Sequence, residues 1–196
     1  GNLARAHRQA GHVSTAIDMY EALLADRTRV LGPDHPHTLT VRNNLAYAHL
    51  EAGHVSTAID MYEALLPDMT RVLGPDHPRT LAARGNLALA AAYQEAGHVD
   101  TAIDMYETLL TDQTRALGPD HPHTLATRGN LATAYYAAGD LQKAIAIYED
   151  LLTDRTRILG PDHPYTLATR NSLAAARNSE STGGEPGIYF EQLFRT

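Results

Sequence analysis

The sequence has no cysteine, no long apolar run and fewer basic than acidic residues. Without cysteine the chain forms no disulfide and has no thiol chemistry, an absence that by itself assigns no compartment. No apolar stretch approaches the roughly 18 residues of a membrane-spanning helix, and no signal peptide is visible, so no membrane role is expected. The formal net charge of −7 argues against nucleic acid and anionic membranes as partners.

The sequence also lacks the residue patterns of common enzymes. It shows no serine–histidine–acid arrangement, no paired catalytic carboxylates and no glycine-rich phosphate-binding loop. We therefore expect no enzymatic activity in this segment, no catalytic residue and no cofactor. Hydrophobic residues make up 43% of the chain and charged residues 20%, which is ordinary for a folded globular protein and excludes wholesale disorder.

Eleven histidines raise the question of a metal site. The densest groups are Asp34-His35-Pro36-His37 and Asp120-His121-Pro122-His123. A zinc site needs three or four ligands that converge on one point, whereas these groups lie whole repeats apart and each holds only two histidines. The pattern favours turn residues near helix starts, so no metal is expected.

A repeated motif dominates what the sequence does contain. Gly-Pro-Asp-His-Pro occurs four times, and its copies are 42, 44 and 42 residues apart, beginning at Gly32, Gly74, Gly118 and Gly160. Each copy follows a leucine and precedes x-Thr-Leu. A fixed period of this size is typical of a repeat array in which each unit contacts only its neighbours. One elongated array without a single central core is therefore expected.

The motif combines a helix stop with a helix start. Its glycine can adopt the left-handed conformation that ends a helix, and the proline after it cannot continue one. Its second proline has a φ angle suited to the first turn of the next helix. Its aspartate can accept hydrogen bonds from the free N–H groups of that turn, and the sequence leaves open whether aspartate or histidine is the N-cap.

Apolar residues between the motifs recur with helical spacing and do not alternate as in a strand. Ile17, Tyr20 and Leu24, for example, fall on one side of a helix. Nine helices and no strand are predicted, over 1–10, 14–31 and 37–52, two pairs within 54–96 and 98–138, and 140–159 and 165–178. The array spans 1–178 as a partial first repeat, three full helix pairs and a final capping helix. A linker over 179–186 and an aromatic tail over 187–196 are expected to follow.

The repeat unit resembles the tetratricopeptide repeat (TPR), in the longer subtype of kinesin light chains. The chain also resembles the TPR arrays attached to signalling NTPases, and the resemblance covers about 1–176. It rests on Asn130-Leu131-Ala132-x-Ala134-Tyr135, Gly139, Ala144-Ile145, Tyr148 and Leu151-Leu152. It implies an all-α fold, an α-solenoid of antiparallel helix pairs wound as a right-handed superhelix. The large aromatic residue usual early in the first helix is replaced by arginine, at Arg42, Arg84, Arg128 and Arg170.

Two features of the repeats need a structural explanation. The recurring arginine falls on the packed side of its helix, which favours an ion pair with a carboxylate of the adjacent helix over contact with a ligand. The third unit has two extra residues between Arg84 and Gly97. Either its helix runs longer and Ala91 takes the inner aromatic position, or a bulge absorbs the surplus.

Asparagines mark the face that lines the concave groove in a TPR array. Asn44, Asn86 and Asn130 each precede a core leucine, and the resemblance implies that they contact a bound peptide, because an amide can both donate to and accept from an extended backbone. Alternatively, they solvate the helix or bond to neighbouring helices. If they bind, replacing Asn86 and Asn130 with alanine weakens binding by about 1–3 kcal/mol. The further expected groove residues are Asn43, Asn171, Tyr47, Thr133, Tyr136 and Arg5. Arg5 and Arg8 are expected to add positive charge at one end of the groove.

Three functions follow from these observations. The first is a scaffold whose groove binds a peptide or a partner domain, although the lysines that clamp chaperone C-termini in other TPR proteins are missing. The second is self-assembly through the array ends or through 187–196, where both phenylalanines of the chain lie. That tail either caps the last helix, occupies the groove of another copy, or stays disordered or foreign to the array. The third is a sensor arm of a larger NTPase or signalling protein.

Overall fold

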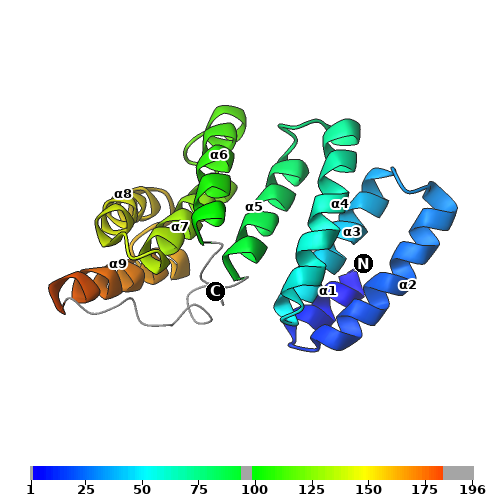
Figure 1. Ribbon diagram of the computed structural model, residues 1–196, viewed down its shortest axis with the longest axis horizontal. Helices are drawn as coiled ribbons and strands as arrows, with labels where there is room; N and C mark the ends of the chain where they lie inside the picture. The colour runs from blue at the N-terminus through cyan, green and yellow to red at the C-terminus, as the bar shows by residue number, and fades with distance from the viewer. Residues whose placement is uncertain (1, 94–98, 183–196) are drawn as a thin grey trace. The chain divides into compact units, whose positions relative to one another are not determined.

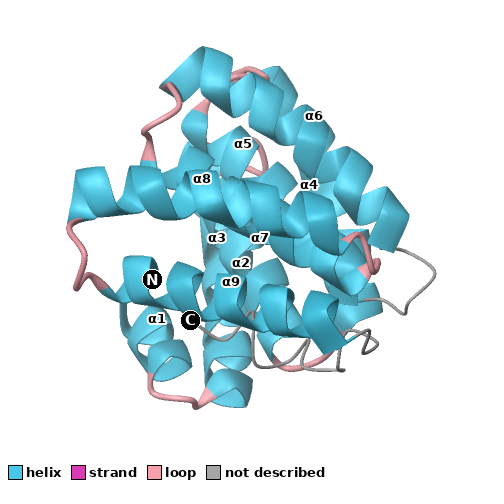
Figure 2. Ribbon diagram, turned by 90° about the vertical axis from the view of Figure 1, so that its left-hand side faces the viewer, coloured by secondary structure: helices cyan, strands magenta, loops and turns pink. Residues whose placement is uncertain are grey.

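A computed structural model describes residues 2–93 and 99–182 of the chain. Every regular element in these two ranges is a helix, and short loops join the helices (Figures 1 and 2). None of these helices is long and apolar enough to cross a membrane. The helices are α1 (Asn2–Gln9), α2 (Val13–Leu31), α3 (Pro36–Glu51), α4 (Val55–Leu73), α5 (Pro78–Tyr93), α6 (Val99–Leu117), α7 (Pro122–Ala137), α8 (Leu141–Leu159) and α9 (Pro164–Thr182).

The chain divides into two compact units, residues 1–94 and 95–196. In the first unit, α1 packs against α2, α2 against α3, α3 against α4 and α4 against α5, and α3 also contacts α5. In the second unit, α6 to α9 pack in the same way, and α7 also contacts α9. The helices of each unit therefore stack in sequence order, as the repeat period predicts.

The Gly-Pro-Asp-His-Pro turns have one geometry at every copy. Gly32, for example, ends α2 with a φ of +88° and donates its N–H to the carbonyl oxygen of Thr28. The histidine is the N-cap of the next helix, because its Nδ1 accepts the backbone N–H two residues further on. The donor–acceptor distances are 3.1 to 3.2 Å at His35, His77, His121 and His163. The interpretation of these histidines as turn residues is confirmed.

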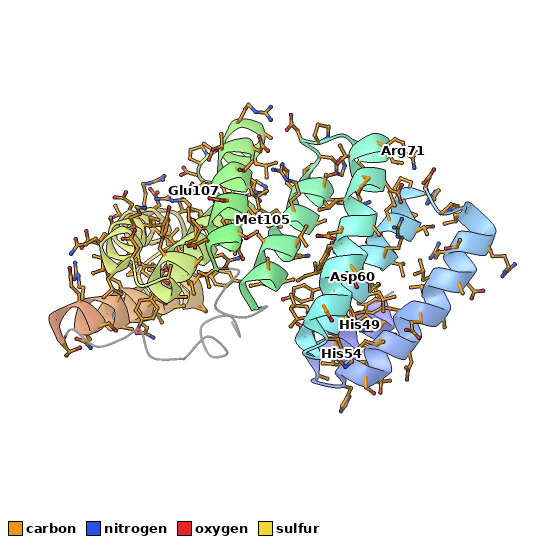
Figure 3. The ribbon with its side chains drawn as sticks, in the orientation of Figure 1. His49, His54, Asp60, Arg71, Met105 and Glu107 are labelled. Carbon is orange, nitrogen blue, oxygen red and sulfur yellow. The ribbon has the colours of Figure 1, made fainter. Side chains whose placement is uncertain are left out.

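The aspartate of the motif has a different use. Asp34 accepts a hydrogen bond from Arg71 of α4 at 2.7 Å, and Arg71 also contacts Asp68 at 3.2 Å. In the second unit Arg157 of α8 pairs in the same way with Asp120, at 2.7 Å. Asp34 and Asp120 therefore each tie their turn to the second helix after it (Figure 3 labels Arg71 on α4).

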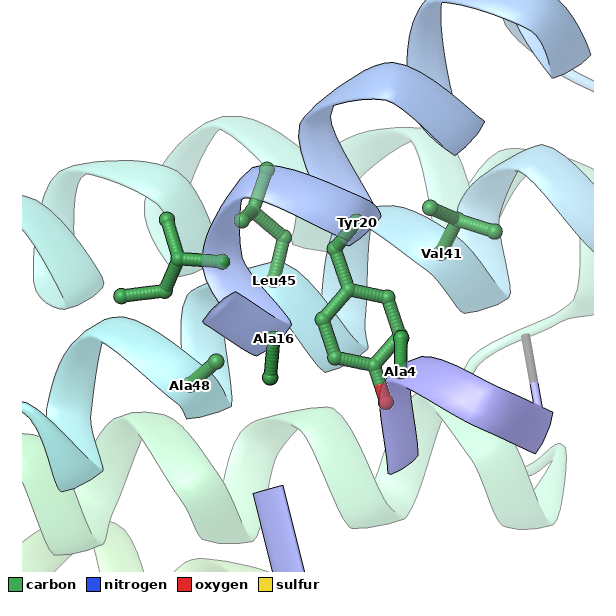
Figure 4. Close-up of a cluster of buried hydrophobic side chains, with 7 residues drawn as sticks. Ala4, Ala16, Tyr20, Val41, Leu45 and Ala48 are labelled. Carbon is green, nitrogen blue, oxygen red and sulfur yellow. The ribbon is translucent and has the colours of Figure 1, made fainter. Parts of the chain in front are cut away.

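Apolar side chains and buried tyrosines fill the space between the helices. Ala4, Ala16, Tyr20, Leu45 and Ala48 belong to one cluster of α1, α2 and α3 (Figure 4). At the place equivalent to Tyr20, α4 and α6 carry Tyr62 and Tyr106, which are both 0% exposed. Full burial of a large apolar side chain stabilises a fold by about 1.5–3 kcal/mol, so these tyrosines are among the side chains that stabilise the packing between helices.

The recurring arginine forms the predicted ion pairs. Arg42 of α3 lies 2.7 Å from Asp68 of α4, and Arg128 of α7 lies 2.5 Å from Asp154 of α8. Arg170 of the last helix instead donates to the carbonyl oxygen of Pro161 at 3.4 Å. The expectation of an Arg–carboxylate contact between adjacent helices is confirmed for Arg42 and Arg128.

Two expectations concern stretches that the structure describes only in part. α5 has 16 residues, as do α3 and α7, and Ala91 is buried at 9% exposure. The choice between a longer helix and a bulge depends on 94–98, which lie outside the described residues. At the other end, α9 continues through Thr182, beyond the expected helix end at 178 and into the expected linker. The aromatic tail over 187–196 lies outside the described residues.

Candidate peptide-binding surface

One predicted groove residue joins three helices. The amide nitrogen of Asn86 on α5 donates to the side-chain oxygen of Asn43 on α3 at 3.5 Å. Asn86 also hydrogen-bonds to the hydroxyl of Tyr62, which donates to the backbone oxygen of Asn43 at 3.5 Å. Burial raises the pKa of the Tyr62 phenol well above its usual range, and the hydrogen bond from Asn86 opposes that shift. The alternative that these amides bond to neighbouring helices therefore describes Asn86 well.

Thr133 and Tyr136 on α7 are buried, at 6% and 8% exposure. The hydroxyl of Thr133 lies 2.8 Å from the hydroxyl of Tyr148 on α8, and the hydroxyl of Tyr136 lies 2.9 Å from that of Ser179 on α9. Both side chains thus join neighbouring helices of the second unit. A role for either of them in peptide binding stays a prediction.

Tyr47 lies in a small network between α1 and α3. The guanidinium carbon of Arg8 lies 4.8 Å from the centroid of the Tyr47 ring, and Arg8 forms an ion pair with Glu51 at 2.5 Å. Burial, followed by the nearby Glu51 carboxylate, raises the pKa of the Tyr47 phenol. The charge of Arg8 is therefore paired with that of Glu51 inside this network. Tyr47 is half-buried in it.

Arg5 and Asn44 meet in one open hollow of the first unit. The hollow has a volume of about 290 Å³ and is lined by residues of α1, α2 and α3: Asn2, Arg5, Leu23, Arg27, His37, Thr40, Val41 and Asn44. Arg5 and Arg27 are exposed, and Asn44 is half-buried. Sequence reasoning identified Arg5 and Asn44 but missed Arg27 and His37, which lie on separate segments and come together only in the fold.

The remaining predicted residues, Asn130 and Asn171, lie in the second unit on α7 and α9. Asn130 is half-buried and Asn171 is exposed. Their peptide contacts stay predictions.

A second hollow, which the sequence did not suggest, lies in the second unit. Its volume is about 510 Å³, and it is lined by Asp100, Ile103, Asp104, Glu107, Tyr135, Ala138, Asp140 and Lys143. The Tyr135 hydroxyl donates to the Glu107 carboxylate, which raises the pKa of the Tyr135 phenol. Lys143 lies over the Tyr135 ring and forms an ion pair with Asp140 at 3.1 Å. Figure 3 labels Glu107 on α6.

Histidines and carboxylates are the candidate ligands of a metal site, which for zinc needs three or four of them converging on one point. Among residues 2–93 and 99–182, no group of three or more histidines and carboxylates could hold a metal ion. The four histidines of the repeated motif use their Nδ1 atoms as helix caps, as described above.

Comparison with known proteins identifies the repeat. A family model described as "Tetratricopeptide repeat" matches residues 1–69 and 88–157. The chain belongs to the tetratricopeptide repeat family. Members of this family are non-catalytic scaffolds for protein interactions, and the helix-pair fold supports this general role for the chain.

Solved structures give the same result for the fold of this TPR chain. Two crystal structures of a Podosopora anserina "putative kinesin light chain" with "nearly identical TPR-like repeats", one of them a single-residue variant, are each 31% identical to it. They cover 98% of this chain and 90% of theirs, with TM-scores of 0.76 and 0.75. BtubC (BKLC) from P. vanneervenii shares the fold at 20% identity and a TM-score of 0.75, covering 97% of this chain and 76% of its own. No curated protein matches the chain. The resemblance to kinesin light chain repeats is therefore confirmed.

Proposed function

We propose that this TPR array binds an extended peptide segment of a partner protein, with its anchor in the hollow around Arg5 and Asn44. The observation that carries the proposal is the joint lining of this hollow by two arginines, two amides and a hydroxyl from α1, α2 and α3. Amide side chains can pair with both groups of an extended backbone, and arginines provide several donors for a carboxylate. The hollow thus offers both backbone recognition and a charged anchor.

The chemistry of the hollow favours an acidic segment. None of its eight lining residues is acidic, although the chain as a whole carries a formal charge of −7. Leu23 and Val41 add apolar surface for a side chain of the ligand. A peptide that places an Asp, a Glu or a terminal carboxylate next to a small apolar residue fits this lining best.

The packing around Asn86 supports the proposal indirectly. A groove binds tightly when its walls are already ordered before the ligand arrives, because less conformational entropy is then lost. The hydrogen bonds of Asn86 to α3 and α4 hold three helices of the first unit together. We assign Asn86 this supporting role and assign direct contact to Asn44.

The experiment is selection of binders from a random linear peptide library on the chain, followed by affinity measurement of the selected peptides. Replacing Arg5 with alanine removes one charged donor and is expected to weaken binding by about tenfold, or roughly 1.5 kcal/mol. The matched control is Arg29→Ala, because Arg29 is an exposed arginine of the same unit that does not line the hollow and pairs with Asp26, at 3.3 Å. Equal affinities of the Arg5→Ala variant and the parent chain for a selected peptide would move the binding site elsewhere.

Self-association is a second candidate, favoured by exposed apolar residues on α9. Tyr165 is 53% exposed and Leu167 is 39% exposed. Size-exclusion chromatography with light scattering, with and without residues 183–196, tests this candidate. The Tyr165→Ala variant is measured in the same way. A dimer that is lost on removal of 183–196 or in Tyr165→Ala supports assembly, whereas a monomeric parent chain excludes it. The role as a sensor arm of a larger NTPase stays a prediction.

A further inference from the structure

The histidines of the chain differ in what their Nδ1 atoms contact. Four of them cap helices, as described above, so their Nδ1 lone pairs are occupied. His49 and His54 differ, because their Nδ1 atoms face each other at 3.2 Å and their ring centroids lie 5.5 Å apart. Figure 3 shows both residues at the turn between α3 and α4.

We propose that His49 and His54 together chelate a divalent transition-metal ion of the kind that prefers imidazole ligands, such as Cu²⁺ or Ni²⁺. Each imidazole nitrogen lies about 2.0–2.1 Å from a bound ion of this class. Two nitrogens 3.2 Å apart then subtend an angle of about 100° at the ion, between the square-planar and tetrahedral values. The observed separation thus needs little adjustment to hold the ion.

The apo and metal-bound forms differ by one proton position. In the apo form one Nδ1 carries a hydrogen and donates it to the other Nδ1. In the bound form both Nδ1 lone pairs point to the ion, and the ring hydrogen of that first histidine moves to its Nε2. No net proton is released when both rings are neutral, and water fills the remaining coordination positions.

The turn leaves both rings available for this role. His54 precedes α4 as its N-cap residue, yet its side chain makes no capping hydrogen bond. At the equivalent place before α8, Asp140 accepts the backbone N–H of Lys143 at 3.2 Å. The side chain of His54, like that of His12 before α2, makes no cap, and its Nδ1 contacts His49.

The test is titration of the chain with Cu²⁺ at pH 7.5, where free imidazole is largely neutral, followed by calorimetry and electron paramagnetic resonance. His7 and His12 form an imidazole pair at the equivalent turn before α2, with ring centroids 5.8 Å apart, so the parent chain for this titration carries His12→Asn. One site with hyperfine coupling to two imidazole nitrogens is then expected. His49→Ala and His54→Asn each remove one ligand and should weaken that site at least tenfold, because the second contact is intramolecular. His54→Asn introduces a preferred N-cap residue, so this variant is expected to stay folded.

The matched control is His37→Ala. The ring of His37 also lies near another imidazole, 5.2 Å from that of His35, but the Nδ1 of His35 is already used as a cap. This variant should retain the site, and Cu²⁺ should raise the thermal midpoint of the parent and of His37→Ala but not of His54→Asn. Parent-like affinity and two-nitrogen coupling in His54→Asn would overturn the proposal, as would loss of the site in His37→Ala.

Discussion

The side-chain amide of Asn86 donates a hydrogen bond to the side-chain oxygen of Asn43, 3.5 Å away and 43 residues earlier in the chain. This contact crosses from α5 to α3, past the buried Tyr62 of α4. It therefore links two successive repeats of the first unit directly. It also distinguishes the roles of two asparagines at equivalent positions of the repeat. Asn44 lines the open hollow, whereas Asn86 hydrogen-bonds to Asn43 and Tyr62 of the neighbouring helices.

Replacing Asn86 with alanine should lower the free energy of unfolding by about 1 kcal/mol, because Asn43 and Tyr62 each lose a hydrogen-bond partner. Asn44→Ala should leave stability within about 0.5 kcal/mol, since Asn44 lines an open hollow. Urea unfolding followed by circular dichroism measures both values. A stability loss in Asn44→Ala equal to that in Asn86→Ala would contradict the distinction between supporting and contact asparagines.

The histidine caps make a second prediction. His77 accepts the backbone N–H of Arg79 at 3.1 Å at the start of α5. His77→Ala leaves that N–H without its side-chain acceptor and should cost about 0.5–1 kcal/mol of stability, whereas His77→Asn should retain most of it. The comparison is made by urea unfolding. His37→Ala is the control, because the ring of His37 is not the acceptor of a cap and its removal should leave stability nearly unchanged. Equal stability of His77→Ala and the parent chain would show that water replaces the cap at no cost.

Acid should weaken the ion pairs between helices. Hydrogen bonds from Arg42 and Arg71 lower the pKa of Asp68, and Arg128 lowers that of Asp154. A carboxyl group with a lowered pKa in the folded state contributes its full stability above the unfolded value of about 3.8 and loses it as the pH falls through the folded value. Stability should therefore decline below about pH 5.

The Asp154→Asn variant tests this origin of the acid sensitivity. It should be less stable than the parent near pH 7, and its unfolding midpoint should change less between pH 5 and pH 2, since one titrating pair is gone. Added salt should reduce the difference at neutral pH, because these side chains are partly exposed to solvent. Parallel pH profiles of the variant and the parent chain would exclude Asp154 as a source.

The helices and their boundaries follow from local features that the sequence displays directly. The glycine and the two prolines of each motif determine where one helix ends and the next begins, so the predicted bounds of α2, α3 and α8 agree with the structure to within a residue. The ion pair of Arg42 was predictable because its angular position relative to the core leucine depends only on helix geometry.

The site was less predictable because its residues meet through packing between helices. A helical wheel places Thr133 and Tyr136 away from the core leucine, yet α8 and α9 bury both side chains by covering that side of α7. Arg27 joins Arg5 only because α2 folds back along α1. Contacts of this kind depend on the distance between helix axes, which the repeat period does not specify.

Gly129 provides a last test of how closely α7 and α8 pack. It lies inside α7 with ordinary helical backbone angles, and an added Cβ would lie 3.5 Å from the Leu151 side chain and 3.6 Å from that of Arg155. These are ordinary van der Waals distances, and alanine is favoured over glycine by about 0.8–1 kcal/mol in a helix interior. Gly129→Ala should therefore raise the free energy of unfolding by about 0.5–1 kcal/mol. Gly139→Ala should lower it, because Gly139 has a φ of +81°. Urea unfolding of the two variants decides the point, and a destabilised Gly129→Ala would mean that Arg155 needs the space which the glycine leaves.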